Sequence, residues 1–243
     1  MELVTKAKIL LPALLLFLWA STPAAARASE ITPDGQRLAQ VLDSMHVEQL
    51  WLSGRQVNWR TGEPNGKIYT NATSHTHCSA FAAAASEKLG VYLLRPPEHS
   101  SVLLANAQQG WLSAEGTNQG WYAISSPLKA QQLANQGQLV VVTCKNPDPD
   151  LPGHIAIIRP STKSDDQIRR EGPQIIQAGA QNFSSTTVKE GFKHHPGVFE
   201  KNQVLYFAHD LSWPAASVQP ATADATGATL APNSPVTTGG GAQ

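Results

Sequence analysis

The sequence predicts an α+β domain in which helices pack on an antiparallel β-sheet. Its helix-type segments come first in the chain, and its strongly β-type segments come afterwards. Short links join the β-type segments, most clearly the first two, whereas a parallel crossover needs a dozen residues or more. Segregated helices and strands of this kind are typical of α+β domains.

Four segments have the composition or spacing of helices. In residues 33–50, apolar side chains recur at the three- and four-residue spacing of one helical face. Residues 78–90 are rich in alanine, the best helix former, and end at Gly90, a residue typical of helix C-termini. We expect this low-charge helix to be buried, with Ser74 or Thr76 as its N-cap. The expected helices are 33–50, 78–90, 103–112 and 127–135.

Four later segments are rich in the β-branched residues that favour strands. The first two flank a turn-forming stretch of Pro, Asp, Asn and Gly. The Gly- and Asn-rich residues 53–76 predict a loop with at most one short strand, and residues 116–121 predict another loop. The expected strands are 139–144, 154–158, 175–179 and 204–208.

The two ends of the chain are expected to lie outside this domain. Residues 1–28 combine two early lysines, a short apolar run and an Ala-x-Ala pattern, which is typical of a secretory signal peptide. The run is shorter than the ~20 residues that span a bilayer. Residues 213–243 are mostly Pro, Ala, Thr, Ser and Gly, which predicts a disordered tail. We therefore expect one domain, 29–212, in a periplasmic or secreted protein.

The charge of the chain excludes several classes of partner. It has 18 basic and 18 acidic residues, and removal of residues 1–28 leaves 15 and 17. No block of lysine and arginine occurs, so we expect no nucleic-acid partner. We expect a monomer that does not stay inserted in a membrane after cleavage.

Cys78 stands where a cysteine becomes a nucleophile. It begins the alanine-rich helix, whose unpaired N–H groups and dipole stabilise a thiolate. We therefore expect its pKa to lie below the free value of ~8.5. The second cysteine, Cys144, ends the first expected strand. In an exported chain the two could instead form a structural disulfide.

A cysteine nucleophile needs an imidazole at hydrogen-bond distance and a third group that orients the imidazole. His154 begins the second expected strand, on the face of Ala156 and Ile158, which we expect to meet the cysteine helix. Gln177 is a polar residue within the apolar third strand, and its carbonyl can accept the imidazole N–H and fix the tautomer. Asn182 is the alternative third group.

Together these segments resemble the NlpC-type papain-like cell-wall peptidases, and CHAP amidases share the general layout. The likeness covers about residues 69–180 and rests on three motifs: Cys78-Ser79-x-Phe81, Gly153-His154-Ile155-Ala156-Ile157-Ile158 and Ile176-Gln177-Ala178. It implies a circularly permuted papain-like fold and a triad of Cys78, His154 and Gln177 without a metal or cofactor. The activity that it implies is hydrolysis of an amide bond in peptidoglycan stem peptides, by an endopeptidase or an amidase.

This chain departs from the family pattern beside the cysteine. The family usually has Asp before the cysteine and Gly two after it, where this chain has His77 and Ala80. That Asp helps to hold the substrate amine, so its replacement leaves the bond preference open. A tyrosine upstream often completes the oxyanion hole, and Tyr69 is the nearest candidate besides the Cys78 N–H. The residues expected to contact substrate or the oxyanion are Tyr69, His77, Ser79 and Asn182.

Three alternatives stay open at this point. His75 and His77 share one side of an extended segment beside Cys78, as in a zinc site, but no further ligand has a recognisable spacing. An amine in place of water would make the enzyme an acyltransferase. A non-catalytic envelope-binding module would use the same fold with a disulfide between Cys78 and Cys144.

Overall fold

The computed structural model describes residues 30–70 and 75–214. The chain divides between Ser212 and Trp213 into two units, and every helix and strand of the described residues lies in the first. The expected signal peptide (1–28) lies outside the described residues, as does the expected tail beyond Pro214. None of the helices in the described ranges has the length and apolar character needed to traverse a bilayer.

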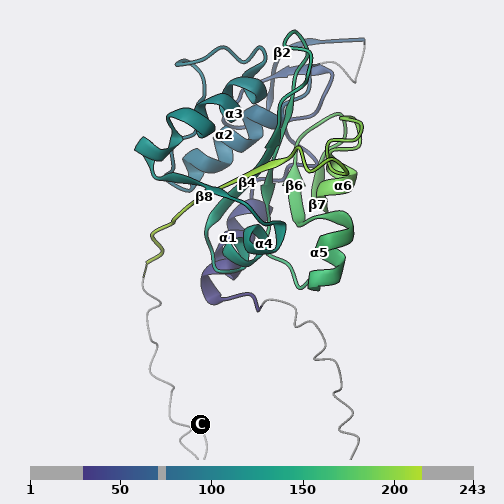
Figure 1. Ribbon diagram of the computed structural model, residues 1–243. Coiled ribbons are helices and arrows are strands. Elements are labelled where there is room, and N and C mark those ends of the chain that lie inside the picture. The colour runs from purple at the N-terminus through teal and green to yellow at the C-terminus, as the bar shows by residue number, and fades with distance from the viewer. Residues whose placement is uncertain (1–29, 71–74, 215–243) are drawn as a thin grey trace, which may run out of the picture. The chain divides into compact units, whose positions relative to one another are not determined.

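A six-stranded sheet carries the first unit (Figure 1). Its strand order is β3-β8-β4-β5-β6-β7, and each neighbouring pair is antiparallel. This confirms the predicted antiparallel sheet, and the four expected strands are found within about two residues of their predicted ends. The sheet strands are β3 (Trp121–Ile124), β4 (Leu139–Cys144), β5 (His154–Ile158), β6 (Gln174–Gln177), β7 (Phe183–Thr187) and β8 (Leu205–His209).

Helices connect the strands, and two short strands form a separate arm. The arm consists of β1 (Arg55–Val57) and β2 (Pro64–Ile68), which pair antiparallel. The predicted helices at 78–90, 103–112 and 127–135 are confirmed, whereas the helix predicted at 33–50 ends at Asp43. The helices are α1 (Pro33–Asp43), α2 (Cys78–Lys88), α3 (Leu104–Ala114), η1 (a 3₁₀ helix, Gly116–Gln119), α4 (Pro127–Asn135), α5 (Asp165–Glu171) and α6 (Val188–Gly191).

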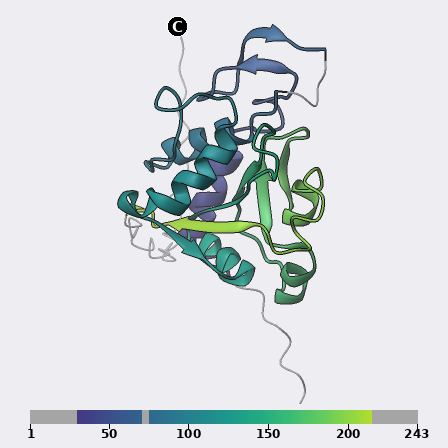
Figure 2. The same cartoon turned by 45° about the horizontal axis from the view of Figure 1, so that its top comes forward.

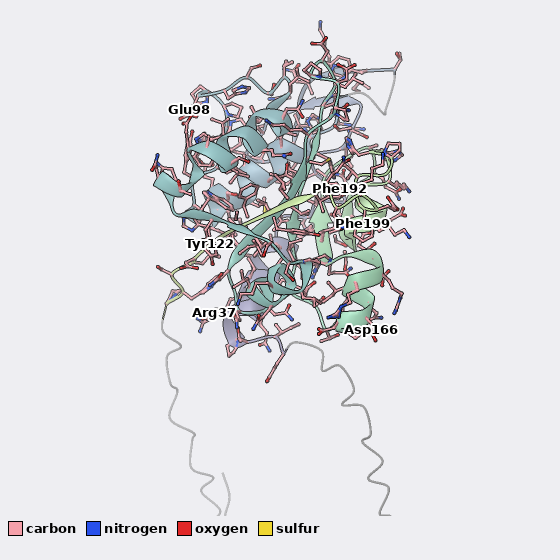
Figure 3. All side chains as sticks on the ribbon, in the orientation of Figure 1. Arg37, Glu98, Tyr122, Asp166, Phe192 and Phe199 are labelled. Atoms are coloured by element: carbon pink, nitrogen blue, oxygen red, sulfur yellow. The ribbon has the colours of Figure 1, made fainter. Side chains whose placement is uncertain are left out.

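The helices cover both faces of the sheet. On one face, α4 and α6 pack against alternate residues of the central strands, such as Val142 of β4 and Ala156 of β5. Phe192 and Phe199 join this cluster, and Figure 3 shows both on the α6 side of the sheet. Helices α2 and α3 contact β5 on the other side, and Figure 2 shows the yellow-green strand β8 between α3 and α4.

The alanine-rich helix α2 is buried along most of its length, as predicted. Its residues 78–86 are all buried, including Ser86, whose hydroxyl donates 2.8 Å to the Ala82 carbonyl. Small side chains let neighbouring elements approach this helix closely on every side. Phe81 is its one large side chain and meets the edge of the Trp51 ring at 5.3 Å between centroids. Packing of the buried residues holds most of α2 in place, and Glu87 near its C-terminal end forms ion pairs with Arg60 and Arg95.

Some elements are not evident in the sequence patterns. Strand β3 begins at Trp121, inside an expected loop, because it pairs with the long-range partner β8. Strand β7 is polar and only half-buried because it lies at the edge of the sheet. Helix α5 buries only Ile168, and its start is set by a capping box between Ser164 and Gln167. Periodicity cannot reveal elements that bury so little apolar surface.

The start of α1 docks on the end of α4 through a single carbonyl. Thr32 caps α1, and both its backbone N–H and its hydroxyl donate to the Asn135 carbonyl, at 2.9 and 3.0 Å. Gly35 lies against the same carbonyl, and a Cβ there would stand 2.2 Å from the Asn135 oxygen. This contact leaves no room for a side chain at position 35.

We predict that Gly35→Ala destabilises the fold although alanine favours helices. The Cβ must displace the end of α4, a clash of the kind that costs about 1–3 kcal/mol. Urea unfolding measures this loss. The matched control, Gln36→Ala on the exposed side of α1, is expected to leave the free energy of unfolding unchanged or slightly raised. Equal stability of the two variants would contradict the docking.

Candidate active site

Cys78 is the first residue of α2, as the sequence predicts. The N-cap is His77 rather than the proposed Thr76, and it makes no side-chain cap hydrogen bond. The other proposed cap, Ser74, lies outside the described residues. The backbone N–H groups of Ile155 in β5, of Ser79 and of Cys78 itself lie close enough to the Cys78 sulfur to lower the pKa of its thiol. The sulfur therefore lies where the helix start meets the start of β5.

Burial changes the expected acidity of Cys78. The residue is only 4 % exposed, and desolvation raises the pKa of its thiol above the ordinary value. The three N–H donors lower it, but their effect is smaller. The prediction of a lowered pKa is therefore wrong for this geometry, because the cost of burying a thiolate exceeds the stabilisation by the helix start.

His154 and Gln177 are brought together as the sequence predicts. The His154 Nε2 lies 2.9 Å from the Gln177 Oε1, and the two side chains are 6 % and 3 % exposed. The register of β5 and β6 explains the contact. Ile157 pairs with Ile176, so continuation of the ladder sets Gln177 opposite Ala156, diagonally across from His154 on the same face.

The amide of Gln177 determines which ring nitrogen of His154 carries the proton. Its Nε2 donates to the Gln181 carbonyl at 3.3 Å, and a carbonyl can only accept. The Oε1 therefore faces His154, so the ring must donate from Nε2. In the neutral ring this leaves Nδ1 unprotonated, with a lone pair that can accept a proton.

Two glycines hold the Gln177 amide in this orientation. A Cβ at Gly191 of α6 would stand 2.5 Å from the Gln177 Oε1, and one at Gly179 would stand 3.3 Å from its Nε2. The amide is thus closely packed on both sides.

His154 lies on the predicted face with Ala156 and Ile158, but this face does not meet α2, so that part of the prediction is wrong. Its strand neighbours Ala156 and Ile158 pack in the cluster of α4 and α6, whereas α2 lies on the other side of β5. Phe192 meets the ring edge-on at 4.6 Å between centroids. The cysteine and the histidine therefore approach each other at the ends of their elements and not through one shared face.

The resting pair is neutral. Burial lowers the pKa of His154 to about 4, while the Gln177 hydrogen bond acts in the opposite sense. Within residues 30–70 and 75–214, no hydrogen bond joins the Cys78 thiol to the His154 ring. A thiol and an unprotonated imidazole are the resting forms that this burial favours.

An asparagine of α3 fixes the turn that leads into His154. The Asn106 Oδ1 accepts from the backbone N–H groups of Gly153 (2.9 Å) and Asn146 (3.2 Å). Its Nδ2 donates to the Leu151 carbonyl at 2.9 Å. A Cβ at Gly153 would lie 2.5 Å from this Oδ1 and 2.2 Å from the Cys144 carbonyl, so only glycine fits before the histidine.

The same helix also holds the nucleophile helix. The fully buried Gln108 donates from Nε2 to the carbonyl of Ser79 at 3.0 Å and to that of Leu94 at 2.9 Å. Helix α3 therefore contacts the start of α2 through Gln108 and the start of β5 through Asn106. The sequence does not reveal these residues, because asparagine and glutamine within a helix carry no motif.

The remaining predicted site residues have other contacts. The Tyr69 ring stacks on His75 at 3.4 Å between centroids. His77 donates from Nε2 to the Arg55 carbonyl at 2.8 Å, so it joins β1 to the start of α2. Asn182 is not a partner of His154, because its Nδ2 bonds the carbonyls of residues 47, 50 and 51 and its Oδ1 accepts from the Gly179 N–H. Ser79 contributes its backbone N–H to the Cys78 sulfur.

Both cysteines are free thiols. Cys144 pairs with His154 across β4 and β5, and its thiol is close enough to Cys78 for a charge there to raise its pKa, which burial brings to about 11. In the part of the chain that the structure describes, no three His, Cys, Asp or Glu side chains are grouped so as to hold a metal ion.

A cavity of about 280 Å³ opens beside the histidine. His154 and Gln177 line it, together with the β4–β5 turn at residues 151–153 and the segment from Glu190 to His195. Thr76 lines it near the start of α2, but Cys78 itself does not. The cavity therefore gives access to the pair from the side of the histidine.

Comparisons with known proteins do not assign the chain to a family. No protein-family model matches the chain, and a search of curated proteins gives no match. The chemistry of the site therefore rests on its own residues.

We predict that Cys78 is a thiol, not a thiolate, at neutral pH. Its raised pKa means that the thiolate forms only as the pH rises above the range of a free cysteine. The ultraviolet absorbance of the wild type minus that of Cys78→Ala is expected to show no thiolate from about pH 5 to about pH 8. Cys144→Ala, as the control, should give the wild-type curve. A thiolate signal across this range would instead reveal a preformed ion pair with His154.

We also predict that Asn106→Leu destabilises the turn before His154. The change leaves two N–H groups and one carbonyl without their partner, and each such loss costs up to about 1–3 kcal/mol. Asn106→Asp keeps the acceptor and should lose less. Urea unfolding and amide exchange at Gly153 measure the effect, with the exposed Asn118→Leu as control. Unchanged exchange at Gly153 in Asn106→Leu would refute this role.

Proposed function

We propose that the chain is an exported cysteine hydrolase of the papain-like type, which cleaves amide bonds in peptidoglycan stem peptides. The observation that carries the proposal is the buried hydrogen bond of His154 to Gln177 beside a cysteine that begins a helix. It leaves the Nδ1 of His154 as a base and gives the ring a fixed orientation. The chain order of α2, β5 and β6 agrees with the layout of the NlpC-type peptidases that the sequence motifs resemble.

In the first half-reaction His154 acts as base and then as acid. The Cys78 thiol gives its proton to the His154 Nδ1 as the sulfur attacks the substrate carbonyl carbon. The backbone N–H of Cys78 is available to the oxyanion when the sulfur moves onto the carbon. The carbon–nitrogen bond then breaks, and the proton passes from Nδ1 to the departing nitrogen. A thioester and a free amine result.

In the second half-reaction water replaces the amine. His154 takes a proton from the water, whose oxygen attacks the thioester carbon. The carbon–sulfur bond breaks, the proton returns to the sulfur, and a carboxylic acid leaves. Neutral resting forms suit this cycle, because each proton moves only as a bond forms or breaks. Gln177 contacts neither the thiol nor the substrate in this mechanism. It keeps the His154 ring in one tautomer during both half-reactions.

Export and the substrate class come from the sequence. The signal-peptide pattern of residues 1–28 directs the chain out of the cytoplasm. Peptidoglycan lies in the compartment that the exported chain reaches. The same motifs that resemble the cell-wall peptidases contain Cys78, His154 and Gln177. The described geometry agrees with their roles as nucleophile, base and orienting group.

We predict that purified mature protein releases amine- and acid-bearing fragments from peptidoglycan, as measured by mass spectrometry. Cys78→Ala should abolish release, because no other group forms the thioester. His154→Ala should lower the rate by roughly 10²–10⁴-fold, the usual contribution of a general base. Gln177→Leu should lower it by roughly 10–100-fold, because the ring loses its orienting partner.

Cys144→Ala is the matched control for loss of a buried thiol, and it should retain activity. The fragment masses identify the amide bond that is cleaved. They also show whether water or an amine accepted the acyl group, which distinguishes hydrolysis from acyl transfer. Absence of any Cys78-dependent product would refute the proposed function.

A further inference from the structure

His195 brings a second imidazole to the cavity beside His154. The two ring centroids are 5.7 Å apart, and the ring planes differ by only 20°. Both rings line the same cavity, His154 from β5 and His195 from the segment after α6. The sequence does not relate them, because 41 positions separate them along the chain.

The His195 ring has hydrogen-bonding capacity that the fold does not use. Within the described ranges, neither ring nitrogen has a hydrogen-bond partner, whereas the backbone N–H donates to the Phe192 carbonyl and the backbone carbonyl accepts from the Val198 N–H. By contrast, the rings of His77 and His209 bond to backbone carbonyls. His195 is half-buried in the cavity wall, so its unused nitrogens are available to a molecule in the cavity.

The ring is neutral, which restricts the chemistry that it recognises. Burial, followed by its neighbours His154 and His194, lowers the pKa of His195 to about 4. The charged residues of the same wall, Glu190 and Lys193, form an ion pair at 2.5 Å and offset each other. The wall therefore suits an uncharged polar group, such as a peptide N–H or carbonyl, better than an anion.

The position of the cavity determines which half of a substrate it holds. In the proposed reaction the nitrogen that leaves the substrate carbonyl carbon receives its proton from His154, so the leaving half lies on the histidine side of the sulfur. The cavity is lined by His154 and Gln177 and not by Cys78. It is thus on the leaving-group side of the bond.

We propose that His195 binds the leaving half of the substrate, by a hydrogen bond between its ring and the peptide group next to the departing nitrogen. This inference rests on the proposed function. In this proposal His195 binds substrate, whereas Cys78 and His154 alone carry out the proposed bond-breaking steps.

The test uses the protein's own products. Amine-bearing and acid-bearing fragments from the wild-type digest are separated, and each is added while iodoacetamide alkylates Cys78. The amine-bearing fragment should slow alkylation of the wild type, and His195→Phe should weaken its binding roughly tenfold, the factor of about one hydrogen bond. His195→Gln, which can still donate and accept, should restore part of the protection. The acid-bearing fragment should protect wild type and His195→Phe equally.

His194→Phe is the control, because it changes the neighbouring, more exposed residue of the same wall. Urea unfolding of each variant verifies that the fold is intact. If the amine-bearing fragment fails to protect the wild type, or protects His195→Phe equally well, the inference is overturned while the proposed function stands. If the wild type yields no fragments, the proposed function fails and the inference falls with it.

Discussion

The hydrogen bond between the His154 Nε2 and the Gln177 Oε1 is the constraint around which the site is built. It is buried, so both partners must be satisfied, and this imposes conditions on the surrounding chain. The β5–β6 register must set the two side chains diagonally across one face. Glycine at residue 191 makes room for the amide, because a Cβ there would stand 2.5 Å from the Gln177 Oε1. Gln181 must present its carbonyl, which turns the amide oxygen toward the ring.

The second constraint is that the proposed nucleophile, Cys78, and the proposed base, His154, belong to elements on different sides of the sheet. Helix α2 and the cluster around His154 are separated by β5 itself, so the two groups can meet only at the ends of their elements. Helix α3 sets this meeting point, because Gln108 bonds the first turn of α2 and Asn106 bonds the turn before β5. A displacement of α3 would move both Cys78 and His154.

Burial explains both the resting state of the site and its access route. Low exposure keeps Cys78 as a thiol and His154 as a neutral base, since either ion would lose its hydration. In the proposed reaction the proton passes from the Cys78 thiol to His154 only when the sulfur attacks the substrate. The cavity would admit that substrate on the side of the histidine. His195 extends that wall with a polar ring that the fold leaves unbonded.

The sequence alone determined the elements with strong local signals. The alanine-rich helix that begins at Cys78, the strand that begins at His154 and the polar Gln177 in an apolar strand were all predictable, because composition and spacing act over a few residues. Polar elements such as β7 and α5 bury little apolar surface and gave no periodic signal.

Only the tertiary structure decided the acidity of Cys78, the side of the sheet on which α2 packs, and the structural role of Asn182. It also brought Asn106 and His195 to the site. Burial and long-range contact depend on how distant segments pack, and no local pattern of residues contains that information.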